Sequence, residues 1–226
     1  MALFISLEGG EGSGKSTQAR LLRDRFLKEG QKAILVHEPG GTSLGDRLRN
    51  ILLQDDSLSD YAELFLFSAA RSEIVSKVIK PSLDRGITVI SDRYVDSTTA
   101  YQGYGRGIDL AFIRSINTVT TQGLVPDLTF LLDMEPAEGL GRVGPVQLGL
   151  GFDGASKDVS LRLDLEGQRR FEEQPIAFHR KIRNGYLRES KTEPDRWVLI
   201  DATSSEEDVQ ELIWDNVRIL LMEKSS

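Results

Sequence analysis

The amino-acid sequence predicts a three-layer α/β domain, in which a five-stranded parallel sheet lies between two layers of helices. Short segments that are apolar nearly throughout alternate with amphipathic helical segments, a pattern typical of a parallel sheet covered on both faces. A glycine-rich turn joins the first strand to the first helix. The 226 residues are enough for a single domain, residues 1–226, with an added lid.

Strands and helices can be assigned in order along the chain. Strands are expected at Leu3–Leu7, Lys32–His37, Ile87–Asp92, Leu128–Asp133 and Trp197–Asp201. Helices are expected at Gln18–Glu29, Leu44–Leu53, Tyr61–Lys80, Leu110–Thr121, Pro175–Glu189 and Glu206–Met222. We expect the long third helix to end at Pro81, because proline breaks the helical hydrogen-bond ladder.

The glycine-rich turn has the spacing Gly-x4-Gly-Lys-Ser/Thr of a phosphate-binding loop. Its nine residues are Gly9, Gly10, Glu11, Gly12, Ser13, Gly14, Lys15, Ser16 and Thr17. A strand–loop–helix unit directs backbone N–H groups and the positive end of a helix at one point. Lys15 can reach the β- and γ-phosphates of a nucleotide, and Ser16 can bind Mg²⁺. The fold class is therefore that of the P-loop NTPases.

Bulk composition narrows the class of partner. A net charge of −7 gives no electrostatic basis for binding a nucleic acid polymer, so the phosphate chemistry should concern small molecules. The hydrophobic fraction of 39% supports a core, and no apolar run is long enough to cross a bilayer. The first strand begins so early that no signal peptide is expected. With no cysteine in the chain, we expect no disulfides and a cytoplasmic location.

Further candidate residues follow the carboxyl ends of strands, where parallel sheets bind ligands. They include Glu38, Pro39, Asp92 and Arg93. Asp92 is a candidate for holding Mg²⁺ near Ser16, although many strands end in aspartate for capping reasons. Arg93 suits a bidentate contact with phosphate; the alternative is a structural salt bridge.

A second group of residues suggests a pocket for a flat base. Phe67 and Arg71 are spaced i, i+4 and share a helix face, an arrangement that also occurs in ordinary core packing. The run Ser97–Gly107 supplies hydroxyl, amide and aromatic groups, including Tyr101 and Gln102. Its composition suits a small polar ligand but equally describes an ordinary loop.

The stretch from Gly139 to Gly154 contains six glycines and is interpreted as a mobile loop. It follows the fourth strand, on the side where ligands bind. We expect a lid at about 139–172 that brings arginines onto a nucleotide; the alternative is a surface insertion with solvated arginines. The candidate arginines are Arg142, Arg162, Arg169 and Arg170.

Taken together, these residues resemble the thymidylate kinases, which phosphorylate dTMP with ATP. The resemblance covers nearly the whole chain. It depends on Phe4–Gln18, Glu38-Pro39-Gly40-Gly41-Thr42, Leu64–Arg71, Asp92-Arg93-Tyr94, Ser97, Ala100-Tyr101-Gln102-Gly103 and Pro126-Asp127-Leu128. The phosphate loop alone occurs in many NTPases. Its combination with Glu38-Pro39-Gly40-Gly41 and Asp92-Arg93-Tyr94 is much more specific.

The resemblance implies a role for each matching residue. Glu11 would contact the sugar 3′-hydroxyl of dTMP, and Arg93 would bind the acceptor phosphate. Phe67 would stack on thymine, with Arg71 directed at its O4 atom. Gln102 would lie near the polar edge of the base, and Tyr101 against the deoxyribose. Glu38, Pro39 and Ser97 belong to the same substrate site.

The resemblance also implies a lid-arginine type of enzyme that uses Mg²⁺ with ATP and forms a homodimer. Some members carry a basic residue inside the phosphate loop, where this chain has Gly12. A lid arginine would then act in transfer, and Arg170 or Arg162 is the best candidate. His37 stands where the family commonly has arginine, and the glycine-rich stretch looks longer than the usual lid.

Two other functions are compatible with parts of the sequence. One is a kinase for another nucleoside or nucleoside monophosphate, with the same loop and a different base pocket. The other is a nucleotide-dependent switch that acts through a partner. The acceptor residues Phe67, Arg71, Arg93 and Gln102 argue against the switch.

Overall fold

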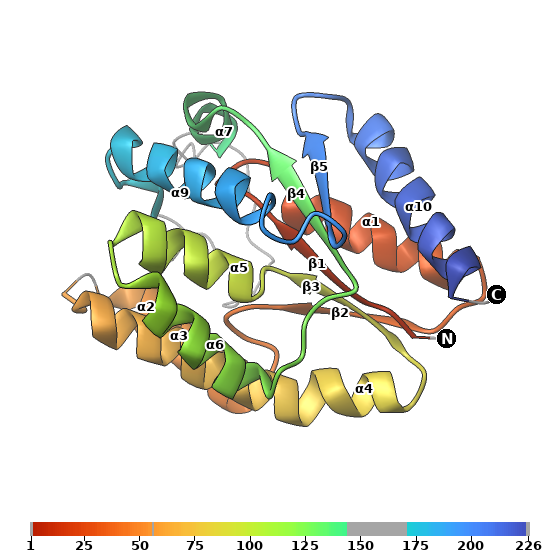
Figure 1. Ribbon diagram of the computed structural model, residues 1–226, viewed down its shortest axis with the longest axis horizontal. Coiled ribbons are helices and arrows are strands. Elements are labelled where there is room, and N and C mark those ends of the chain that lie inside the picture. Colours follow the sequence, from red (N-terminus) through yellow and green to blue (C-terminus); the bar gives the residue numbers. More distant parts are fainter. Residues whose placement is uncertain (1, 56, 144–170, 225–226) are drawn as a thin grey trace, which may run out of the picture.

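The computed structural model describes residues 2–55, 57–143 and 171–224, and over these residues it has the predicted three-layer architecture (Figure 1). Five parallel strands form the sheet in the order β2-β3-β1-β4-β5. They are β1 (Phe4–Glu8), β2 (Ala33–His37), β3 (Thr88–Asp92), β4 (Leu128–Asp133) and β5 (Trp197–Asp201). Because all five run in one direction, their carboxyl ends meet at one edge of the sheet.

Alternation of side chains along the strands creates two cores. Leu3, Ile5 and Leu7 pack with α1 (Lys15–Lys28) and α10 (Glu206–Glu223) on one face. Phe4 faces the opposite side, where α3 (Asp60–Ile74) and α9 (Ile176–Glu189) cover the sheet. Residues at even positions of β1 therefore point into the layer that also carries the helices after β2 and β3.

Side-chain caps explain where several helices begin. The side chains of Thr42, Ser59, Asp109 and Ser205 accept hydrogen bonds from backbone N–H groups in the first turns of α2 (Ser43–Gln54), α3, α6 (Leu110–Thr121) and α10. Such caps satisfy donors that would otherwise lack an intrahelical partner. The predicted starts of these four helices are confirmed to within one residue.

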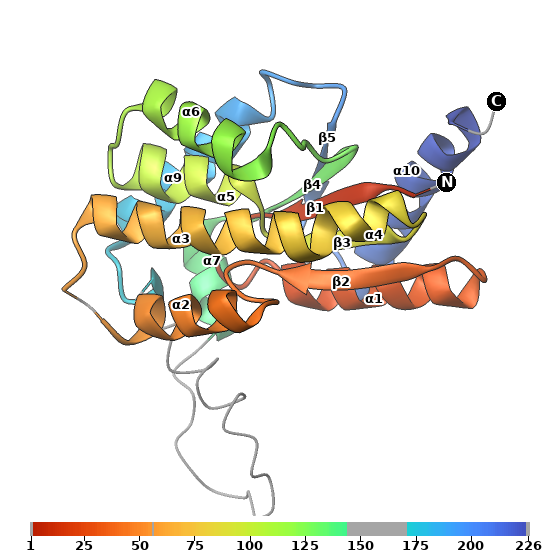
Figure 2. The ribbon, with the colours of Figure 1, turned by 90° about the horizontal axis from the view of Figure 1, so that it is seen from below.

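The prediction that the long helix ends at Pro81 is wrong. Val75–Ile79 forms a π-helical segment, η1, and α4 (Lys80–Asp84) follows without a break, so that α3, η1 and α4 form one rod (Figure 2). Pro81 lies in the first turn of α4. The first N–H groups of a helical segment have no hydrogen-bond partner within that segment, so the N–H that proline lacks is not needed there.

Two segments interpreted as loops are helical. α7 (Pro136–Val143) includes Gly139–Val143, where an i, i+4 ion pair joins Glu138 to Arg142 at 3.2 Å. The rest of the predicted lid up to residue 170 lies outside the described residues. The segment after β3 forms α5 (Val95–Thr98) and the π-helical η2 (Thr99–Gly105). Nearly all of η2 is buried, because its apolar side packs on α9.

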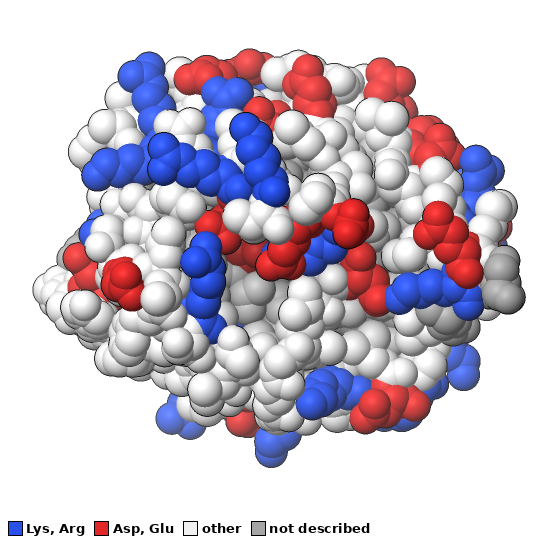
Figure 3. Space-filling view, viewed as in Figure 1, with Lys and Arg blue, Asp and Glu red and all other residues white. Residues whose placement is uncertain are grey.

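Surface composition is mixed on the face seen in Figure 3, where acidic and basic side chains are interspersed. A group of basic side chains gathers where α9 lies, a helix that contains Arg180, Lys181, Arg183 and Arg188. Among the described residues, none of the helices has the length and apolar character that a bilayer crossing requires.

The phosphate-binding loop packs backbone to backbone against α7. Gly12 has φ of +70°, and a Cβ atom there would lie 2.0 Å from the carbonyl oxygen of Gly139. A Cβ atom on Gly139 would lie 2.2 Å from the carbonyl oxygen of Glu11. Neither position has room for a side chain, so the closeness of this contact depends on both glycines.

We predict that Gly139→Ala lowers the thermal midpoint by several degrees, because the new methyl group must push α7 away from the loop. The clash should cost about 1–3 kcal/mol, which outweighs the gain of up to about 1 kcal/mol from helix propensity. Gly141→Ala is the matched control on the same helix, since no atom of the described residues lies within 4 Å of its Cβ position. It should leave the midpoint unchanged or raise it. Equal melting temperatures for the two variants would contradict this contact.

Candidate active site

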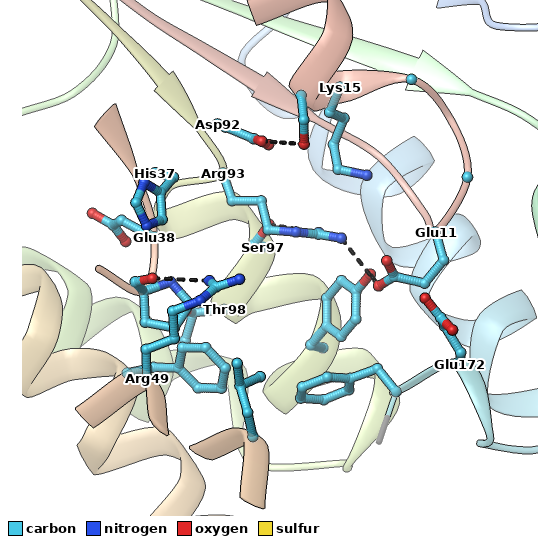
Figure 4. Close-up of a pocket in the computed structure, with 18 of the residues that line it drawn as sticks. Glu11, Lys15, His37, Glu38, Arg49, Asp92, Arg93, Ser97, Thr98 and Glu172 are labelled. Carbon is cyan, nitrogen blue, oxygen red and sulfur yellow. Dashed lines mark hydrogen bonds and ion pairs between the residues drawn. The ribbon is translucent and has the colours of Figure 1, made fainter. Parts of the chain in front are cut away.

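A cavity of about 700 Å³ opens at the carboxyl edge of the sheet (Figure 4). It brings together most of the residues singled out in the sequence: Glu11, Gly12, Gly14, Lys15, Ser16, Thr17, Glu38, Pro39, Phe67, Arg71, Asp92, Arg93, Ser97, Tyr101 and Gln102. Gly9, Gly10 and Ser13 belong to the same phosphate-binding loop. Arg162 and Arg170 lie outside the described residues.

The phosphate-binding loop ends at the N-terminus of α1. Gly14 caps this helix with φ of +87°, a left-handed conformation that glycine adopts without a Cβ clash. The Lys15 ammonium is buried and donates to the carbonyl oxygen of Gly10 at 2.5 Å and to Ser13 Oγ at 3.2 Å. Burial, and then the charge of Arg93, lower the pKa of Lys15 to about 8. An anion bound beside Lys15 would raise this pKa again.

Ser16 and Asp92 provide a pair of hard oxygen ligands. The Ser16 hydroxyl donates to Asp92 Oδ2 at 2.5 Å, so oxygen atoms from α1 and β3 converge beside the loop. Among the described residues no three His, Cys, Asp or Glu side chains gather as a metal cage. Mg²⁺ suits such a place, because it usually binds one or two protein oxygens together with substrate phosphates and water.

Arg93 lies at the centre of the cavity (Figure 4). Its guanidinium donates to Glu11 Oε1 at 3.0 Å, to Ser97 Oγ at 3.2 Å and to the carbonyl oxygen of Gly9 at 3.2 Å. It also lies 5.0 Å from the centre of the Tyr101 ring. Although burial opposes the charge, Tyr101 and Glu11 raise the pKa of Arg93 well above its ordinary value. Arg93 is therefore a fixed cation that touches the phosphate-binding loop and α5 at once.

The carboxylate of Glu11 stays ionised inside the cavity. Burial would raise its pKa, but the charges of Arg93 and Lys15 outweigh burial and hold the pKa below its ordinary value. The Tyr101 hydroxyl also donates to Glu11 Oε1, at 2.5 Å. This explains why a carboxylate is tolerated inside a phosphate-binding loop: two cations and a hydroxyl surround it.

Arg71 reaches the cavity as part of a buried ion pair. Its side chain is 2% exposed and pairs with Glu38 at 2.7 Å. It also donates to Thr98, Asn117 and the carbonyl oxygen of Tyr94. Burial raises the pKa of Glu38 while Arg71 works against that rise. The sequence suggested a guanidinium open to a ligand; in the structure protein acceptors hold it rigid.

Aromatic rings and one amide form the rest of this side. The Phe67 and Phe171 rings lie 6.4 Å apart, and Phe171 meets Tyr101 edge to face at 5.4 Å. Gln102 Nε2 donates to Glu63 Oε1 at 2.8 Å. Because a carboxylate can only accept, this bond fixes the amide and turns its oxygen away from Glu63.

Several lining residues were missed by sequence reasoning, namely Arg49, Thr98, Phe171 and Glu172. Arg49 projects from α2 and donates to the carbonyl oxygen of Pro39 at 3.0 Å. Its only sequence signal is its place on a helix that follows Glu38 and Pro39. Phe171 and Glu172 directly follow the arginines considered for the lid, and nothing in their spacing distinguishes them.

Comparisons with known proteins agree with this geometry. Residues 7–148 match the family model described as thymidylate kinase. The chain belongs to the thymidylate kinase family. It is 42% identical to the thymidylate kinase of Dehalococcoides mccartyi, with 98% of each chain covered, and 46% identical to that of Oleidesulfovibrio alaskensis, with 93% and 95% covered. The crystal structure of thymidylate kinase from Ehrlichia chaffeensis matches with a TM-score of 0.71 and 32% identity, over 96% of this chain and 98% of that one.

Beside the motifs that mark this family, the structure has a buried acidic centre. Glu8, the last residue of β1, is fully buried. Burial, and then the carboxylate of Asp96, raise the pKa of Glu8 from 4.5 to about 7, while Arg93 opposes the rise. Lys15 also faces this centre, and Arg196 pairs with Asp96 at 2.8 Å.

We predict that the wild-type protein loses stability relative to Glu8→Gln as pH rises from about 5 to about 8. Between about pH 5 and 7 the unfolded chain has already released the Glu8 proton, whereas the folded protein still holds it; above about pH 7 both have released it. Stability therefore falls with rising pH, by the linkage between proton binding and folding. Glutamine does not titrate and removes this loss. The thermal midpoints of the two proteins, measured across this range, should diverge by about 3 °C or more in favour of the variant. Parallel curves would contradict the raised pKa.

Proposed function

We propose that this protein transfers the γ-phosphoryl group of ATP to dTMP, giving dTDP and ADP, in the cavity at the carboxyl edge of the sheet. The observation that carries the proposal is the position of Arg93. This one cation contacts the phosphate-binding loop through Glu11 and Gly9 and faces the aromatic side through Ser97 and Tyr101. It therefore lies where a donor and an acceptor phosphate would meet.

The chemistry needs alignment and positive charge more than it needs a covalent intermediate. Lys15 binds the β- and γ-phosphates of ATP, and Arg93 binds the acceptor phosphate. Ser16 and Asp92 would hold Mg²⁺, which would supply positive charge beside the phosphates when bound. A lid arginine, Arg170 or Arg162, supplies a further cation.

The acceptor nucleoside occupies the aromatic side. Phe67 stacks on thymine, and the sugar lies against Tyr101 with its 3′-hydroxyl on Glu11. The Gln102 oxygen accepts the ring N–H of thymine, a hydrogen that cytosine lacks. Arg71, held rigid by Glu38, is the donor toward O4. Leaving such buried groups without a partner penalises the wrong base.

The partners in this proposal are small molecules, ATP and dTMP, and the location is the cytoplasm, where nucleotides for DNA synthesis are made.

We also propose a homodimer. Tyr61 and Phe65 on α3 meet Phe112 on α6 with ring centres 6.1 and 6.5 Å apart, yet Tyr61 and Phe65 are about half exposed. Val119 extends this apolar face along α6 at 76% exposure. A second copy of the same face would bury all four side chains.

A coupled assay of ADP release with a panel of nucleoside monophosphates tests the function. We predict rapid turnover of dTMP and about fourfold lower kcat/KM for dUMP, because the missing methyl group is worth about 0.8 kcal/mol. The value for dCMP should be at least about 100-fold lower, because its base leaves the amide oxygen and guanidinium poorly paired.

Lys15→Ala is the control for this assay and should abolish dTMP-dependent ADP release. Similar turnover of dTMP and dCMP would contradict the base pocket. ADP release that does not depend on any monophosphate would contradict the acceptor site.

The dimer can be tested by changing Phe65 to aspartate, which places a charge at the centre of the apolar face. The wild type should have twice the 25.2 kDa mass of the chain in light scattering after gel filtration, and Phe65→Asp should have that of one chain. Leu212→Asp, at an exposed position on α10, should keep the dimer mass. A wild type that is monomeric at high concentration would contradict the proposal.

A further inference from the structure

Glu8 is not among the residues that bind nucleotide or Mg²⁺ in the proposed function. Its buried carboxylate nevertheless accepts hydrogen bonds from three separate donors. Tyr94 N donates to Oε1 at 2.7 Å. Ser97 Oγ and Tyr186 Oη donate to Oε2 at 2.6 and 3.1 Å. Two of these donors lead to Arg93: Tyr94 follows it directly in the chain, and Ser97 Oγ accepts a hydrogen bond from its guanidinium.

The first link runs through the backbone. Arg93 has φ of +71°, a left-handed conformation that costs a residue with a Cβ atom about 1 kcal/mol or more. The peptide after Arg93 is held from both sides, because Ser91 Oγ donates to its carbonyl oxygen at 2.6 Å and Glu8 accepts from its N–H. Since the orientation of this peptide follows from the dihedral angles of Arg93, the two bonds together fix the unusual conformation.

The second link runs through a hydroxyl. Above its pKa of about 7, Glu8 is a carboxylate that can only accept, so the Ser97 proton points at Glu8. The lone pairs of Ser97 Oγ are then available to the Arg93 Nη1 group, 3.2 Å away. The charge of Glu8 thus sets the direction of the hydrogen bond that holds the Arg93 guanidinium.

From these two links we infer that Glu8 is a positioning residue for the acceptor phosphate, which keeps the backbone and the guanidinium of Arg93 in the geometry that binds dTMP. This inference depends on the proposed function. Glu8 does not touch either nucleotide. Its hydrogen bonds reach Arg93 through Tyr94 and Ser97, whereas it reaches Lys15 through charge alone. Its loss should therefore weaken dTMP more than ATP.

Glutamine at position 8 has nearly the same volume but cannot replace the carboxylate. If its oxygen accepts from Tyr94 N, its NH₂ group faces Ser97 and reverses the bond that orients that hydroxyl. If the amide flips, its NH₂ group opposes the Tyr94 N–H. Either way one link to Arg93 is lost, and hydrogen bonds to charged groups are the strong ones.

The test compares wild type, Glu8→Gln and Ser6→Ala. Ser6 lies on the same strand and is equally buried. Among the described residues, its hydroxyl bonds only to the hydroxyl of Thr129, at 2.9 Å. At a pH above 7, where Glu8 is ionised, affinities for dTMP and for a non-hydrolysable ATP analogue are measured by calorimetry, and the KM values of both substrates by the coupled assay. For Glu8→Gln we expect the Kd and KM of dTMP to rise about tenfold, with the ATP values within about twofold. Ser6→Ala should leave both unchanged.

Equal weakening of both nucleotides in Glu8→Gln, or unchanged dTMP binding, would overturn the inference. Should Glu8→Gln fail to fold, Ser91→Ala removes the other bond to the same peptide; a raised dTMP KM supports the clamp on Arg93, and an unchanged KM overturns it. Absence of dTMP binding by the wild type would instead refute the proposed function, so the two failures are distinguishable.

Discussion

A single guanidinium, that of Arg93, must remain charged and fixed in a cavity where burial opposes it. The structure meets this constraint by bringing the ends of β1 and β3 together, so that Gly9 and Glu11 of the phosphate-binding loop contact the residue after β3. The left-handed backbone of Arg93 turns its side chain back over the loop. Neighbouring parallel strands make this convergence possible, because they end at the same edge of the sheet.

Other buried charges in the site are also paired with charges of opposite sign. Arg71 pairs with Glu38 at 2.7 Å, and Arg196 pairs with Asp96 at 2.8 Å. Such pairs contribute little net stability, but removing one partner from a buried pair typically costs about 3–5 kcal/mol. Their value here is geometric, since each fixes a side chain or helix that borders the cavity. Glu8 is compensated less fully, since burial, and then the carboxylate of Asp96, raise its pKa.

The sequence was sufficient for the sheet and for most of the site because both depend on local signals. Apolar runs predicted all five strands, and the spacing from Gly9 to Thr17 predicted the phosphate-binding loop. The extension of the helix past Pro81 escaped prediction, because a π-helical segment depends on tertiary packing. The bonds of Arg71 to Glu38, Thr98 and Tyr94 also escaped prediction, since contacts between residues 23 to 33 positions apart leave no local pattern. The role of Glu8 requires the register of β1 beside β3, which the sequence does not give.

Binding of a bisubstrate molecule, in which adenosine and thymidine are joined by five phosphates, tests the central claim most directly. If Arg93 lies between two anion sites in one cavity, calorimetry should give one molecule per chain. The affinity should exceed that for dTMP by about 100-fold or more, because binding at one site holds the linked nucleoside close to the other site. Both ATP and dTMP should compete with this molecule for binding. Competition by only one of the two nucleotides would contradict the account.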